Sequence, residues 1–149
     1  MRKLICAALG AMLALLLLSM AAAEGEFNYT IQEDGVYITG YKGKESIVTI
    51  PDEIEGQPVV SVSIQENVYL AELTLPSHPV VLPEIAFNGC SSLVKINGLE
   101  NVCALGSDAF AGTSLRELVF SDPLDQVDVY GLYSNAFSIT IPDDISFDL

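Results

Sequence analysis

The sequence predicts a repeat solenoid, mainly β, with short parallel strands and an N-terminal β-hairpin cap. Three observations carry this prediction. The dipeptide Ala86-Phe87 returns 23 residues later as Ala109-Phe110, and each copy is followed, after one residue, by a glycine. A matching apolar ladder precedes each copy, so whole units of about 22 residues recur. Short β-rich runs also end repeatedly on Ile-Pro or Leu-Pro, where proline cannot donate to a strand ladder.

Residues 1–23 are typical of a signal peptide. A positively charged start precedes an apolar run from Leu4 to Met20, and three alanines end at Ala23. We therefore expect cleavage after Ala23 and export without a membrane or lipid anchor, because Glu24 stands where a lipoprotein needs cysteine. An uncleaved membrane anchor is the alternative, although a span needs roughly 20 apolar residues and this run is shorter.

The exported chain is expected to be strongly acidic. Without Arg2 and Lys3, 4 basic residues face 20 acidic ones, so the formal charge changes from −14 to 4 − 20 = −16. Such a field repels phosphate backbones and anionic membranes, which argues against nucleic acid and membrane surfaces as partners. The remaining 149 − 23 = 126 residues suit one domain. Acidic residues usually form a solvated surface, and calcium binding is the alternative.

Two cysteines remain once Cys6 leaves with the signal peptide. Cys90 closes one repeat unit, whereas Cys103 lies midway through the next. We therefore favour two free thiols, with Cys90 buried as a small apolar side chain. A disulfide is the alternative in an oxidising compartment. The cysteines have no CxxC spacing and no nearby histidine, so we expect no metal site.

Residues 24–45 are predicted to form the N-terminal β cap. Phe27 to Ile31 alternates apolar and polar residues, Glu33-Asp34-Gly35 is a turn signal, and Val36 to Tyr41 is a second β-rich run. This pattern predicts a hairpin that covers one end of the solenoid core. Its aromatic side chains are expected to pack rather than to form a ligand platform.

The repeat domain is predicted over residues 46–149, with about four units at 46–69, 70–92, 93–114 and 115–149. The first unit lacks the Ala-Phe pair and carries Glu66-Asn67 near its place, and the last reaches Ala136-Phe137 without the following glycine. Such degenerate ends are typical of capping repeats. In the third unit, the side chains expected to point inward are those of Leu93, Ile96, Leu99, Val102, Leu105, Ala109 and Phe110.

The run Ala-Phe-x-Gly-Cys-Ser-Ser-Leu that begins at Ala86, with the Ile-Pro strand endings, resembles the BspA-like class of leucine-rich repeats. The opening from Gly35 to Tyr41, followed by Val48 to Pro51 and Glu55 to Val62, is similar to the N-terminal stretch of many secreted bacterial proteins of this class. The resemblance covers nearly all of residues 27–144. It implies a curved solenoid with parallel strands on one side and an extracellular role in adhesion or protein binding. It implies no catalysis.

Catalytic and metal-binding patterns are weak. His78 stands between Ser77 and Pro79 in a predicted turn, without a nucleophile elbow or a second histidine, so we expect a surface loop residue. Clustered aspartates near the C-terminus fit no EF-hand and no glycine-rich calcium repeat, so we expect them to be solvated. They are Asp122, Asp125, Asp128, Asp143 and Asp144. No cofactor is expected.

Strand alternation predicts an interaction face. Positions between the inward leucines should point outward from the parallel strands, and solenoids commonly bind partners on this side. The alternative is that these residues are merely the solvent face of a sheet. The predicted residues are Glu72, Thr74, Lys95, Asn97, Glu117 and Val119.

The leading hypothesis is a secreted, non-catalytic leucine-rich-repeat module that binds an extracellular protein or cell-surface ligand. Two alternatives stay open. The chain is a structural or truncated piece of a larger repeat surface protein, or it is an acidic calcium-binding or hydrolytic domain. We favour the first hypothesis because the sequence contains repeats but matches no known arrangement of catalytic residues.

Overall fold

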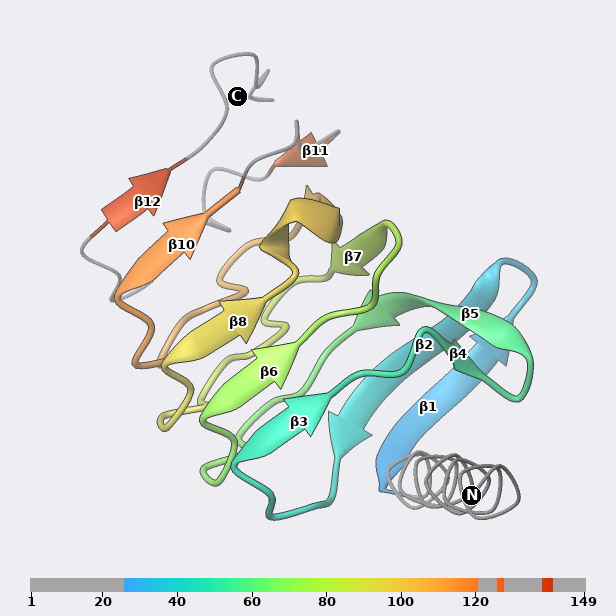
Figure 1. Ribbon diagram of the computed structural model, residues 1–149, viewed down its shortest axis with the longest axis horizontal. Coiled ribbons are helices and arrows are strands. Elements are labelled where there is room, and N and C mark those ends of the chain that lie inside the picture. Colours follow the sequence, from blue (N-terminus) through green and yellow to red (C-terminus); the bar gives the residue numbers. More distant parts are fainter. Residues whose placement is uncertain (1–25, 121–125, 128–137, 141–149) are drawn as a thin grey trace, which may run out of the picture.

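The computed structural model describes residues 26–120, 126–127 and 138–140. The expected signal peptide and the Ala136-Phe137 pair lie outside these residues. So do the five acids considered for calcium binding, Asp122, Asp125, Asp128, Asp143 and Asp144. Two rows of short strands face each other across one core, and the chain passes from row to row as it winds (Figure 1). The predicted class, a mainly β repeat solenoid with parallel strands, is confirmed.

The predicted hairpin begins the fold. Strands β1 (Phe27–Gln32) and β2 (Gly35–Tyr41) are antiparallel, with Phe27 opposite Tyr41 and Gln32 opposite Gly35. Phe27 is buried, and its ring centroid lies 5.0 Å from that of Tyr41. The hairpin aromatics that pack on the core therefore cover its first coil, as expected of a cap.

One row of strands continues from the hairpin. Strand β2 pairs in parallel with β5 (Gln57–Val62), and β7 (Val80–Leu82), β9 (Val102–Leu105) and β11 (Gln126–Val127) follow in order. The short β4 (Glu53–Ile54) pairs antiparallel with β5. The sheet thus grows by one parallel strand per coil.

The second row carries the predicted interaction face. Strands β3 (Ile47–Thr49), β6 (Glu72–Thr74) and β8 (Lys95–Asn97) form one parallel sheet. Strands β10 (Glu117–Val119) and β12 (Ser138–Thr140) form a separate parallel pair. The 3₁₀-helix η1 (Leu99–Asn101) follows β8 directly. The row is therefore divided between β8 and β10 (Figure 1).

The inward side chains of the third unit behave as predicted. Six of the seven residues are buried, and Ile96 is partly buried against the same core. The rings of Phe87 and Phe110 are stacked with centroids 6.1 Å apart, and Phe87 N–H donates to Ala109 O at 2.7 Å. Each Ala-Phe pair thus locks one coil onto the next.

The turns after the Ala-Phe pairs need a left-handed residue. Gly89 and Gly112 have φ values of 76° and 72°, which glycine adopts without steric cost. In the first coil the equivalent hydrogen bond runs from Ile64 N–H to Ala86 O, so Ser63-Ile64 occupies the Ala-Phe position. Glu66, with a φ of 56°, then occupies the glycine position. The first unit therefore has the same turn, although the Ala-Phe pair and the glycine that mark it in the other units are replaced by other residues.

Candidate interaction face

The predicted face residues flank the inward residue of each short strand. In β6, Leu73 is buried between Glu72 and Thr74, which are both partly exposed. The register places Glu72 beside Lys95 and Thr74 beside Asn97, because β6 and β8 are parallel neighbours. These four side chains therefore lie on one surface, as strand alternation predicts.

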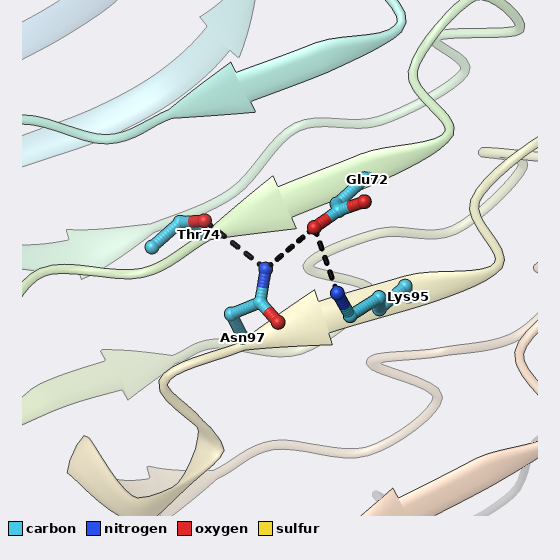
Figure 2. Close-up of polar contacts among 4 residues, drawn as sticks. All are labelled: Glu72, Thr74, Lys95 and Asn97. Atoms are coloured by element: carbon cyan, nitrogen blue, oxygen red, sulfur yellow. Dashed lines mark hydrogen bonds and ion pairs between the residues drawn. The ribbon is translucent and has the colours of Figure 1, made fainter.

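Hydrogen bonds join these four side chains (Figure 2). Lys95 Nζ donates to Glu72 Oε1 at 2.9 Å, and Asn97 Nδ2 donates to the same oxygen at 2.9 Å. Asn97 Nδ2 also lies 3.2 Å from Thr74 Oγ1, which accepts a second contact. The surface between β6 and β8 is consequently an ordered polar network with a defined arrangement of donors and acceptors.

The network favours the ionised form of Glu72. The hydrogen bond from Asn97, followed by the hydrogen bond and positive charge of Lys95, lowers the pKa of the Glu72 carboxyl below its ordinary value. Both groups of the ion pair are substantially exposed, so water and salt screen their attraction. We therefore expect the ion pair to contribute little to the stability of the fold.

Glu117 and Val119 do not join the network. Both are exposed on β10, which pairs with β12 and not with β8 within the described residues. A signal for this division is present in the sequence. The first two units end their strands on Ile50-Pro51 and Leu75-Pro76, but Gly98-Leu99 stands at the corresponding place in the third. The six predicted residues thus form one group of four and one separate pair.

Asn67 is a structurally important residue that the sequence interpretation missed. Its Nδ2 donates to the carbonyl oxygens of Tyr41 and Gly43 at 3.3 and 3.2 Å, and its Oδ1 accepts from the amides of Tyr69 and Leu70 at 3.0 Å each. The residue occupies the position held by Cys90 in the next coil and is buried. It joins the end of the cap to the first repeat.

Asp52, Ser77 and His78 come together on the surface, but not as a catalytic triad. Ser77 Oγ donates to Asp52 Oδ2 and Ser77 N–H donates to Asp52 Oδ1, both at 2.7 Å. The imidazole of His78 faces two backbone carbonyl oxygens instead of the serine. A triad requires histidine between the nucleophile and the acid. The cluster therefore fixes a loop against the neighbouring coil.

We expect this cluster to make the stability of the fold depend on pH. The hydrogen bonds from the Ser77 hydroxyl and amide, and then the charge of His78, lower the pKa of Asp52. Its contribution is thus present above the ordinary aspartate pKa of about 3.9 and is lost as the pH falls through the lower folded value. Because Asp52 is exposed and solvent screens its interactions, we expect Asp52→Asn to reduce the free energy of unfolding by about 0.5–1 kcal/mol at pH 7 and by less at acidic pH, about 2.5.

Urea denaturation at both pH values measures this difference. Glu53→Gln is the matched control, because Glu53 is an exposed acid next in the chain. An equal loss for Asp52→Asn at both pH values would show that the carboxylate charge makes no contribution.

The two cysteines lie in different surroundings. Cys90 is fully buried and its Sγ contacts Ile64 O at 3.0 Å, whereas Cys103 is partly exposed and its Sγ lies 3.5 Å from Val80 O. Burial raises the pKa of the Cys90 thiol. Cys90 accordingly behaves as the predicted small apolar core residue, and the structure has both cysteines as free thiols.

The described residues hold neither a metal-ligand cluster nor a membrane-spanning helix. They contain no group of three or more histidine, cysteine, aspartate or glutamate side chains placed to hold a metal ion. Within the same part of the chain, no helix has the length and hydrophobicity of a membrane span. The acids named for the calcium hypothesis lie outside the described residues, so that hypothesis stays a prediction.

Comparison with known proteins identifies the family of the repeats. A family model described as a BspA type leucine-rich repeat region matches residues 60–147 in six copies. The chain belongs to the BspA-type leucine-rich repeat family. A leucine-rich repeat protein from T. pallidum has a similar crystal structure, with a TM-score of 0.52 and 22% sequence identity over 83% of each chain. No curated protein matches the chain.

Membership of the BspA-type family indicates a general class of function, namely protein interaction. Leucine-rich repeat domains generally mediate protein interactions, and their fold typically carries no catalysis. BspA-type repeats are typical of bacterial surface or secreted proteins. The similarity to the T. pallidum protein supports the fold alone.

Proposed function

We propose that this chain is a secreted, non-catalytic module that binds an extracellular protein or cell-surface ligand through the outward face of β6, β8 and β10. The ordered network of Glu72, Lys95 and Asn97 carries the proposal. It presents a carboxylate, an ammonium group and amide atoms that are hydrogen-bonded to one another across two neighbouring strands. Pre-arranged side chains lose little conformational entropy on binding, which favours a specific partner.

The charge of the chain supports a protein partner in particular. Electrostatic complementarity mainly raises the association rate and the specificity of a protein complex. The expected mature charge of −16, from 4 basic and 20 acidic residues, favours a partner surface with positive charge. The proposed export rests on the signal-peptide pattern of residues 1–23 and on the typical location of BspA-type proteins.

Substitution of the face tests the proposal. We expect the triple variant Glu72→Ala, Lys95→Ala and Glu117→Ala to weaken partner capture by at least about tenfold, because interface truncations that matter cost more than about 1 kcal/mol each. The chain exported after cleavage at Ala23 serves as bait for extracellular proteins and glycans, and the affinity of each captured partner is then measured by calorimetry.

A matched triple variant controls for charge. Lys42, Glu53 and Glu84 are exposed residues outside the face, and their replacement by alanine changes the net charge by the same amount. The control variant should capture partners as the unmodified chain does. Equal capture by both triple variants, with unchanged circular dichroism, would remove the face from the hypothesis.

A further inference from the structure

The break between β8 and β10 interrupts an otherwise regular ladder. At the other junctions of this row, an amide just after one strand donates to the last carbonyl of the next, as from Leu75 to Asn97 and from Phe120 to Thr140, both at 2.9 Å. The equivalent bond from Gly98 to Val119 is absent from the described residues. Ser114 N–H still donates to Leu93 O at 2.9 Å, so the coils touch before the strands begin and then separate.

The separation leaves two strand edges facing each other. Lys95 and Asn97 use their backbone groups to pair with β6, so alternation directs the N–H and C=O of Ile96 toward β10. By the same alternation, the backbone groups of Glu117 and Val119 point toward β8, because Phe120 N–H bonds toward β12. Unpaired edges of this kind are templates for an additional strand.

A cleft of about 600 Å³ lies between these edges. This volume is within the range of about 300–1,000 Å³ that is common for ligand sites. Its walls include Val94 and Val119, which are 56% and 45% exposed. Strand addition has two requirements. The unpaired backbone groups can form hydrogen bonds with an added strand, and the apolar side chains can contact every second side chain of that strand.

The charges around the cleft favour a basic occupant. Glu100 and Glu117 line the cleft, are exposed, and form no ion pair or side-chain hydrogen bond within the described residues. Lys95 also lines it, but its charge is compensated by Glu72 at 2.9 Å. Of the charged residues that line the cleft, two are carboxylates, Glu100 and Glu117, and two are cations, Lys95 and Arg116. A negative field at the cleft therefore comes from Glu72, which pairs with Lys95, and from the strongly acidic chain as a whole.

We propose that the cleft between β8 and β10 binds an extended, basic peptide segment of a protein partner as an inserted strand. This inference rests on the proposed function and specifies how the partner is held. The backbone of the segment pairs with the edges at Ile96 and Val119, and its cationic side chains reach Glu100 and Glu117. The segment restores the ladder that is interrupted at this junction.

A synthetic peptide tests the inference with the exported chain. The probe has blocked ends and about eight residues that alternate lysine and valine, and a second probe carries N-methyl groups on alternate residues along one edge. Calorimetry measures affinity, and amide NMR shifts locate the site. We expect the methylated probe to bind at least about tenfold more weakly, because each lost backbone hydrogen bond contributes about 0.5–1.5 kcal/mol. Equal affinity of the two probes, which have the same charge, would overturn the inference.

Substitutions separate the cleft from general charge attraction. We expect the double variant Glu100→Gln and Glu117→Gln to bind the unmethylated probe about fivefold more weakly. The double variant Glu53→Gln and Glu84→Gln, which removes the same charge elsewhere on the surface, should bind it unchanged. Equal effects of the two double variants would contradict the cleft as the site.

Failure of the inserted-strand proposal can be distinguished from failure of the proposed function. If Glu72→Ala and Lys95→Ala abolish partner capture while the probe does not bind, the face proposal stands and the inserted strand is wrong. If the probe shifts the amides of β8 and β10 while the exported chain captures no extracellular partner, the cleft stands and the proposed function fails.

Discussion

Replacement of Phe87 by alanine is expected to reduce the free energy of unfolding by about 3–5 kcal/mol, the usual range for a buried phenylalanine. Phe87 is fully buried and stacks on Phe110 with ring centroids 6.1 Å apart. It belongs to a central coil, with Ile64 at the equivalent position on one side and Phe110 on the other. Its removal therefore leaves a cavity between coils that the stacked backbones hold open.

Urea denaturation followed by circular dichroism measures this loss. Ile47→Ala is the control, because Ile47 is a large apolar residue of β3 with 67% of its surface exposed. We expect the control to change stability by less than about 0.5 kcal/mol. A Phe87→Ala loss no greater than that of the control would show that the repeated Ala-Phe pair does not hold the coils together.

Replacement of Asn67 by alanine is expected to cost about 3 kcal/mol. The substitution deprives two carbonyl oxygens and two amides of their side-chain partner at the junction of cap and repeat. Each buried polar group left without a partner costs about 1–3 kcal/mol, although water reaches some of them after the side chain is removed. Asn67→Asp should be similarly harmful, because a carboxylate cannot donate to Tyr41 O and Gly43 O.

Thermal and urea denaturation of both variants measure this effect. Asn88→Ala is the matched control, because Asn88 lies in the next coil and its side chain forms no hydrogen bond within the described residues. A loss below about 1 kcal/mol for Asn67→Ala would show that the cap and the first repeat are joined by other contacts.

Much of the fold follows from the sequence because the same physical requirement recurs in each coil. Phe110 must fill the space beside Phe87, and Gly112 must turn left-handed as Gly89 does, so both residues repeat. The first coil meets these requirements differently. Ser63-Ile64 fills the core position and Glu66 adopts the left-handed turn, so a search for the repeated letters does not detect it.

The candidate face is partly predictable for a related reason. Alternation along three-residue strands places Glu72 and Lys95 outward once Leu73 points inward. The hydrogen bonds of Asn97 depend on side-chain geometry that alternation does not specify. The separation of β10 from β8 depends on the chain after Asn97, where Gly98 and η1 replace the proline-ended strand. Repeat spacing alone contains no information about that local path.

We propose that partners bind on the outward face of β6, β8 and β10, and β6 and β8 carry its hydrogen-bonded network. Hydrogen exchange of the exported chain, with and without a captured extracellular partner, tests it most directly. We predict slower exchange of the amides in Glu72–Thr74 and Lys95–Asn97 when the partner is bound, with unchanged exchange in the opposite strands β5 and β7. Protection confined to β5 and β7, with β6 and β8 unchanged, would show that partners bind on the opposite row of strands.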